Sequence, residues 1–204
     1  MSTRIEIKST SAPTPVGATL MKTGQTTSYV TGDDGDLQEG RDISFNMLPA
    51  NNLFGNTDRF TDTQGNQVYT SNNIVIDWST LQGTRVLGYS RLIAGNQTWD
   101  NALASASGLS IGTFTSGWRM ANIREVTNIF QYKAGINHML DYSPFNATIT
   151  GPHSLWTSTT DIANSINAYF CGTTYGIIGV VDKTAVGAKY LAVRTFSWDG
   201  TQLT

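Results

Sequence analysis

"SGWRMANIREVTNIF", residues 116–130, places a Trp-Arg pair just before a predicted helix. Asn122 is a favoured helix-capping residue, and Glu125 follows three residues later, which is the capping-box spacing. The apolar residues after the cap form one helical stripe: Ile123, Val126, Ile129 and Phe130. The sequence therefore predicts a helix directly after Asn122. Trp118 and Arg119 lie just before this helix, so their roles are expected to concern its start.

An earlier helix is predicted in "TWDNALASASGL", residues 98–109. Thr98 is suited to cap this helix, and Gly108 is suited to end it. Its apolar residues follow helical spacing: Trp99, Ala102, Leu103 and Ala106.

Short strands and turns are predicted on both sides of the two helices. Residues 59–78, "RFTDTQGNQVYTSNNIVIDW", place a turn at Gln64-Gly65-Asn66 before two strand-like runs. Further strand-like runs lie at 84–93, 154–160, 166–172, 176–183 and 189–196. Strands, two helices and then strands again predict an α+β domain built on an antiparallel sheet.

The composition limits the kinds of partner that the chain can have. Charged residues make up 14% of the 204 residues, against about 25% in an average domain, while Gly, Ser, Thr and Asn supply about two-fifths. The net charge is −2 and no Lys/Arg cluster is present, so no nucleic-acid partner is expected. The single cysteine, Cys171, excludes an internal disulfide and a cysteine-rich zinc site, and it is expected to be a buried strand thiol.

Residues 1–20 differ in pattern from the rest of the chain. Residues 4–8, "RIEIK", alternate as a strand does, and the two prolines of "STSAPTPVGAT" then indicate an extended linker. We expect a docking arm at 1–20 and one domain at 21–204; the alternative is that the arm is an edge strand of the same domain. No signal-peptide pattern and no membrane-spanning apolar stretch are present, so neither secretion by that route nor a membrane partner is expected.

Six motifs along the chain resemble those of one family. They are residues 23–40, then "RFTDTQGNQVYTSNNIVIDW", "TWDNALASA", "GWRMANIREV", "LWTSTT" and "YLAVRTF". In this order they resemble the Lcl C-terminal-domain-like family, whose pattern includes Arg-Phe-Thr-Asp, Trp-x-x-Ala, Trp-Arg-Leu-Pro, Trp-Ser-Ser-Thr and Val-Arg. The match spans residues 23–196 with three departures: Met120-Ala121 replaces Leu-Pro, Thr157 replaces Ser, and Val126 replaces Leu.

The resemblance implies a C-type-lectin-like fold, in which two helices flank antiparallel sheets and long loops form the binding face. It also implies structural roles for the motif residues. Trp118 is expected to pack between the sheet and the helix that follows it, and Arg119 to bond backbone carbonyls or a buried carboxylate. The residues expected to have structural roles are Trp78, Trp99, Trp118, Arg119, Asn122, Glu125, Trp156 and Arg194.

Catalytic readings of the sequence have little support. "GLSIG", residues 108–112, matches the nucleophile-elbow pattern, and Asp141 and His153 follow Ser110 in hydrolase order. That elbow needs a strand before the serine, whereas here a predicted helix ends at Gly108, so a helix exit is the favoured interpretation. We expect no catalytic residues, no cofactor and no enzyme activity.

The sequence does not favour a metal site, but one loop is a candidate for ligand binding. Neither His138 nor His153 has metal-ligand spacing, and the acidic cluster of Asp33, Asp34, Asp36 and Glu39 lacks the EF-hand pattern, so a solvated turn is favoured over calcium. The loop 137–156 is predicted to carry ligand-binding side chains, since loops on a rigid scaffold commonly bind partners. The candidates are Tyr142, Phe145 and His153; the alternative is that these aromatic residues pack the loop down.

The family contains phage structural proteins and bacterial surface adhesins, which leads to two expectations. The first is a non-enzymatic phage virion protein (tail, fibre, baseplate or capsid decoration) at the particle surface, which displays the lectin-like domain for host attachment. Its partners would be other virion proteins through the arm, further copies of itself, and a host-surface glycan or protein. The alternative is a bacterial cell-surface adhesin module that binds carbohydrate or protein; a hydrolase or oxidase is a third, weaker class.

Overall fold

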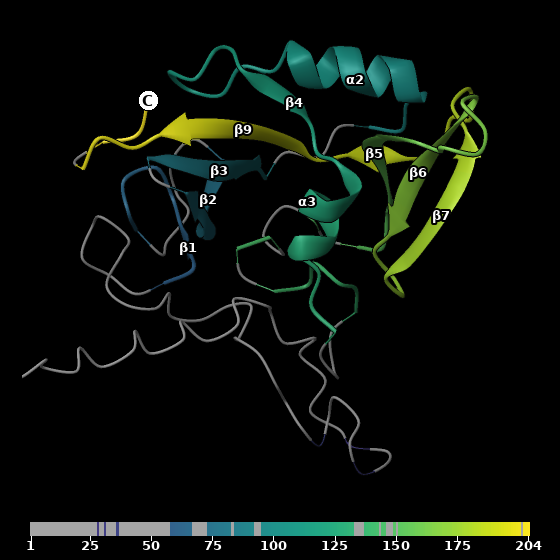
Figure 1. Cartoon of the computed structure of the whole chain (residues 1–204), viewed down its shortest axis with the longest axis horizontal. Helices are drawn as coiled ribbons and strands as arrows, with labels where there is room; N and C mark the ends of the chain where they lie inside the picture. Colours follow the sequence, from purple (N-terminus) through teal and green to yellow (C-terminus); the bar gives the residue numbers. More distant parts are fainter. Residues whose placement is uncertain are drawn as a thin grey trace, which may run out of the picture.

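The computed structural model of the chain describes two sheets and two helices (Figure 1). The residues described are 58–66, 73–82, 84–91, 95–132, 137–142, 144–145, 149, 151–200 and 202–204, with Ser28, Thr31 and Asp36. Within this part of the chain most strand pairs are antiparallel. The α+β class predicted from the sequence is therefore confirmed.

Several expectations fall on residues outside this part. They concern the arm at 1–20, the strand-like run at 67–70, and the carboxylates Asp33, Asp34 and Glu39. The division into an arm and a domain at residue 21 accordingly stays a prediction.

The first sheet has five strands in the order β1-β2-β3-β9-β4. Their bounds are Phe60–Thr61, Ile74–Gln82, Arg85–Ser90, Ala192–Ser197 and Trp118–Met120. Each neighbouring pair is antiparallel. The sheet thus combines β1, β2 and β3 with the last strand, β9. Strand β4, which precedes the second described helix, lies at one edge of this sheet.

Strand β2 is buried on both faces, which explains its almost continuous apolar sequence "IVIDW". Its alternate residues point to opposite faces of the sheet. Ile74, Ile76 and Trp78 enter a core with Ala102 and Ala106 of the first helix. Val75 enters a second core. The first sheet therefore lies between two cores.

The second sheet has four strands in the order β7-β6-β5-β8. Their bounds are Ile177–Asp182, Asn167–Gly172, Ser154–Thr160 and Lys189–Tyr190. The β5–β8 pair is parallel and the other two pairs are antiparallel. Figure 1 shows β7 at the outer margin of this sheet, with β6 between β7 and β5.

The two described helices are short and are capped differently. Helix α2 spans Trp99–Ser107 and ends at Gly108, but the side chain of Thr98 makes no capping hydrogen bond, contrary to expectation. Helix α3 spans Ile123–Asn128 and starts with a complete capping box. Neither of these two described helices has the length and apolar character that crossing a bilayer requires.

Candidate binding surface

Trp118 is buried, but not where the resemblance implied. The expected position was between the sheet and the helix that follows, which is α3. The side chain instead lies in the core that α2 covers, with its ring 6.2 Å from that of Phe196. Its indole N–H donates to the Phe114 carbonyl over 2.9 Å. The reason is that residues 118–120 form strand β4, whose alternate side chains point to opposite faces of the sheet.

Arg119 points away from that core and pairs with Glu125 at the start of α3. Arg119 Nη1 donates to Glu125 Oε2 over 2.7 Å. The same carboxylate oxygen accepts the backbone N–H of Asn122, and Asn122 Oδ1 accepts the backbone N–H of Glu125. The hydrogen bonds to Glu125 raise the pKa of Arg119. Arg119 thus joins β4 to the cap of α3.

The other tryptophans of the sequence motifs each donate their indole N–H to a protein acceptor. Trp78 donates to the Thr61 hydroxyl, Trp99 to the Thr157 carbonyl, and Trp156 to the Gln97 carbonyl, over 2.7–2.9 Å. Trp78 and Trp156 are fully buried. Such bonds let an indole be buried without losing a hydrogen bond, so these rings act as core elements that join separate parts of the chain.

Arg194 lies on the first sheet between aromatic rings. Its guanidinium carbon is 4.5 Å from the centroid of Phe196 and 5.0 Å from that of Phe114. Its Nε donates to the Ser116 carbonyl over 2.9 Å. Burial lowers the pKa of Arg194, although cation–π contacts of this kind favour the charged form. The contacts hold the 114–118 turn against β9.

A buried ion pair joins Arg59 to Asp77, and it was not among the pairs expected from the sequence. Arg59 Nε and Nη2 donate to the two carboxylate oxygens over 2.8 and 2.7 Å, and both side chains are fully buried. Asp77 also accepts from the side chains of Ser79 and Asn128. Burial alone lowers the pKa of Arg59, but the Asp77 carboxylate outweighs it and raises that pKa. The motif residue Arg59 was a signal for this pair.

Two of the three candidate ligand residues lie inside the protein. Phe145 is fully buried, and Tyr142 is buried with its hydroxyl donating to the Ile129 carbonyl over 2.6 Å. Both rings lie in one cluster with Phe60: the Phe145 ring meets the rings of Phe60 and Tyr142 edge-on, and the Phe60 and Tyr142 rings are tilted by 45° to each other. The expectation that they are exposed anchors is therefore wrong, since a buried ring offers no face to a ligand. They pack the loop onto the second core.

His153 is the third candidate, and it is partly exposed just before β5. Its Nε2 is 3.4 Å from Nζ of Lys189, on the neighbouring strand β8. Burial, then the charges of Lys189 and His138, lower the pKa of His153. These effects favour the neutral form of the ring next to Lys189.

Three other side chains that could take part in chemistry are Ser110, Asp141 and Cys171. Ser110 is exposed in the turn after α2, and the Asp141 carboxylate accepts bonds from Asn137. Cys171 is buried in β6, and burial raises its pKa to about 12. The described residues include no group of three or more His, Cys, Asp and Glu that could hold a metal ion. Asp36, the one described member of the acidic cluster, is exposed.

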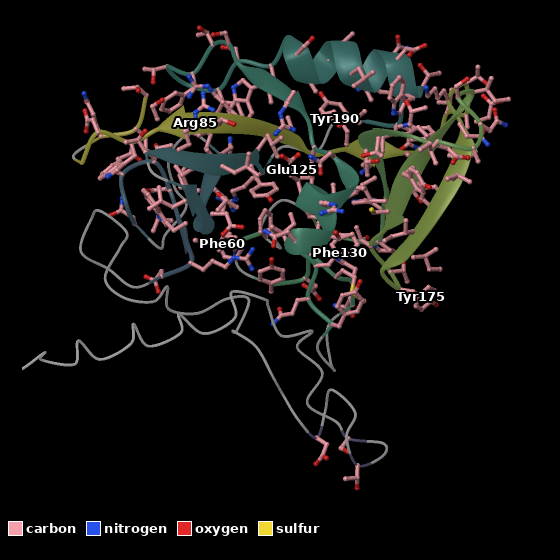
Figure 2. All side chains as sticks on the ribbon, in the orientation of Figure 1. Phe60, Arg85, Glu125, Phe130, Tyr175 and Tyr190 are labelled. Carbon is pink, nitrogen blue, oxygen red and sulfur yellow. The ribbon has the colours of Figure 1, made fainter. Side chains whose placement is uncertain are left out.

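One part of the surface is strongly apolar, and the sequence analysis did not identify it. All the large apolar side chains that are exposed among the described residues lie on the second sheet, in its turns or against them. We call this the second-sheet surface; its residues are Tyr132, Ile162, Ile166, Tyr175, Ile177, Ile178, Val180 and Val186. Tyr175 projects from the end of the β6–β7 hairpin (Figure 2). Exposed apolar side chains concentrated on one sheet indicate a candidate contact site.

An apolar pocket adjoins the second-sheet surface. Its volume is about 220 Å³, and Trp156, Phe170 and Val181 line it together with Ser154 and residues 185–188. Val186 is 69% exposed. The size suits one apolar side chain or a small apolar ring, because ligand sites for drug-sized molecules begin at about 300 Å³.

A function can be inferred from two features: the tryptophan and arginine side chains of the sequence motifs, and the second-sheet surface. A scan of the chain against protein-family models finds no match, and a search of curated proteins finds none either. The contacts described above and the order of the sequence motifs therefore carry the functional inference.

Proposed function

We propose that this chain is a non-enzymatic structural protein of a phage particle. Its C-type-lectin-like domain lies at the particle surface, and its arm at residues 1–20 docks onto other virion proteins. The motif order supports this assignment, because the family it resembles contains phage structural proteins. The antiparallel sheets and the two described helices are compatible with the lectin-like fold.

One observation carries the proposal: the tryptophan and arginine residues of the sequence motifs have structural roles in the fold. Trp118 is only 3% exposed and Arg119 is paired with Glu125, which supports structural roles for both residues. Trp78, Trp99 and Trp156 are likewise engaged by carbonyl or hydroxyl acceptors. A motif set used to build a scaffold supports display and binding more than chemistry.

Mass spectrometry of purified particles tests the virion assignment. Particles would be banded on a density gradient from a lysate of the host that makes this chain. Peptides of the chain should be recovered in constant ratio to the major capsid protein across the particle band. Recovery only from the host cell envelope would contradict the assignment and favour an adhesin, and a glycan array would then examine carbohydrate binding.

Deleting residues 2–18 tests the docking role of the arm. The truncated chain should keep the circular-dichroism spectrum and the melting behaviour of the full chain, because the described core lies at residues 58–204. It should no longer be incorporated into particles. Normal incorporation of the truncated chain would rule the docking role out, while the assignment to the particle would remain.

A further inference from the structure

Strand β7 has the sequence of an interior strand but lies at the margin of its sheet. It reads "IIGVVD", and among the described strands it has a neighbour, β6, on one side only. Its side chains are apolar on both faces. Ile177 is 54% exposed on one face, and Ile178 and Val180 are 50% and 44% exposed on the other. Strands with two apolar faces are normally covered on both sides. An exposed apolar edge is a ready template for another strand.

The free edge of β7 has a defined hydrogen-bonding phase. The register with β6 runs without a bulge from Asn167↔Asp182 to Gly172↔Ile177, and the Lys183 N–H extends it by donating to the Ile166 carbonyl. Antiparallel ladder bonds alternate between the two sides of a strand. The backbone N–H and C=O groups of Ile178 and Val180 therefore point away from β6, toward any strand that joins this edge.

The arm at residues 4–8 fits this edge poorly. As an extended strand, the sequence "RIEIK" would put Arg4, Glu6 and Lys8 on one face and two isoleucines on the other. Because β7 is apolar on both faces, either orientation of the arm would place these charged side chains beside exposed isoleucine or valine. A strand that is itself uncharged and apolar on both faces is the better match, and β7 of a second copy is such a strand.

Self-pairing of β7 centred on Gly179 has complementary chemistry. In this register Ile178 lies opposite the partner's Val180, and Ile177 lies opposite the partner's Val181. The strand is uncharged from Ile177 to Val181, and Asp182 falls opposite the partner's Gly176, so no like charges face each other. Phe170 of β6 covers each central glycine, since a Cβ on Gly179 would lie 2.7 Å from its ring. Both faces of β7 are thus matched.

We propose that β7 pairs antiparallel with β7 of a second copy about a two-fold axis at Gly179. The pairing joins two four-stranded sheets into one continuous sheet. The interface is isologous and closes on itself, so it ends at a dimer instead of growing into a fibre. The inference goes beyond the proposed function and does not depend on where the protein is located.

Charge variants of the full-length chain test the pairing. In this register, lysine at both positions (Ile178→Lys with Val180→Lys) places lysines opposite lysines, and glutamate at both positions opposes glutamates. Light scattering after gel filtration should give twice 22.1 kDa for the wild type and 22.1 kDa for each double variant. An equimolar mixture of the two double variants should return to twice 22.1 kDa, because lysines then face glutamates.

Matched controls separate pairing from a general effect of charge. Ile162→Lys changes an isoleucine that is 98% exposed in the β5–β6 turn, so the doubled mass should remain. A wild type of single mass, doubled mass in the double variants, or a mixture that stays monomeric would each overturn the proposal.

Hydrogen exchange of the wild type gives a test that does not depend on variant folding. The amides of Ile178 and Val180 should lose protection by at least tenfold when the protein is diluted below the dissociation constant. The amide protection of Phe170, in the interior strand β6, should stay unchanged over the same dilution. Protection of Ile178 and Val180 that is independent of concentration would contradict pairing with a second copy.

Discussion

At the scale of single residues, burial determines what each charged pair contributes. Arg59 and Asp77 are both fully buried, whereas Arg119 is 47% exposed where it meets Glu125. A buried charge that loses its partner keeps its desolvation cost, while an exposed charge is solvated again by water. The two pairs therefore provide an internal comparison.

Replacing Asp77 with Asn should lower the free energy of unfolding by about 3–5 kcal/mol, because the Arg59 guanidinium stays buried without its carboxylate. Arg119→Ala is the matched control and should cost about 1 kcal/mol or less. Urea denaturation at neutral pH, followed by tryptophan fluorescence, measures both values. Equal costs for the two variants would show that burial does not distinguish the pairs.

The Cys171 thiol should be unreactive in the folded protein. Burial raises its pKa to about 12, so at pH 8 it remains a neutral thiol, and the nucleophilic thiolate forms only as the pH rises toward that value. We expect labelling with a chromogenic disulfide reagent at pH 8 to be about 100-fold slower or more in the native state than in denaturant. Comparable rates in the two states would refute this burial.

At the scale of elements, the two described helices begin with caps of unequal strength. Asn122 accepts the Glu125 backbone N–H, and the Glu125 side chain accepts that of Asn122. Thr98 stands at the same position in α2, but its side chain makes no capping bond. Burial of Ala102 and Ala106 supports α2 instead, as packing supports most short helices.

Asn122→Ala should therefore lower the free energy of unfolding by about 1 kcal/mol, since the Glu125 backbone N–H loses its side-chain acceptor. Thr98→Ala should change it by a few tenths of a kcal/mol at most, because no capping bond is lost. Thermal melts of both variants at one protein concentration provide the comparison. A larger loss for Thr98→Ala would invalidate the assignment of cap strengths.

At the level of the whole fold, the large apolar side chains that are exposed among the described residues are concentrated on the second sheet, and the first sheet lies between two cores. Paired β7 strands would stabilise the folded state by mass action. The wild-type melting temperature should accordingly rise with protein concentration, by a few degrees over a hundredfold range. Differential scanning fluorimetry should find no such rise for the double variant with lysine at positions 178 and 180.

The elements of the chain could largely be predicted from local pattern. The run 154–160 is strand β5 as predicted, and the helix after Asn122 starts where its cap indicated. No strand was predicted at 118–120, because three residues are too few to show a strand pattern. These residues form strand β4 because they pair with β9. Helix α3 ends at Asn128, so Ile129 and Phe130 continue the apolar stripe beyond it.

The candidate site was less predictable. Tyr142 and Phe145 lie in a long segment without periodic pattern, and nothing local distinguishes an exposed aromatic from a buried one. The Arg59–Asp77 pair joins residues 18 positions apart, and the β7 margin depends on the order of strands in the sheet. Such features arise from contacts between distant segments, which periodicity does not report.

The α+β class, the Asn122 cap and most strands could be predicted from the sequence alone, because they follow from the spacing of neighbouring side chains and from backbone preferences. Which faces are covered depends on how the elements pack in the folded chain. This packing buried Tyr142 and Phe145, turned Trp118 toward α2, and left β7 exposed on both faces. The physical reason is that burial is a property of packed elements, and the same apolar residue is core or contact surface according to what lies against it.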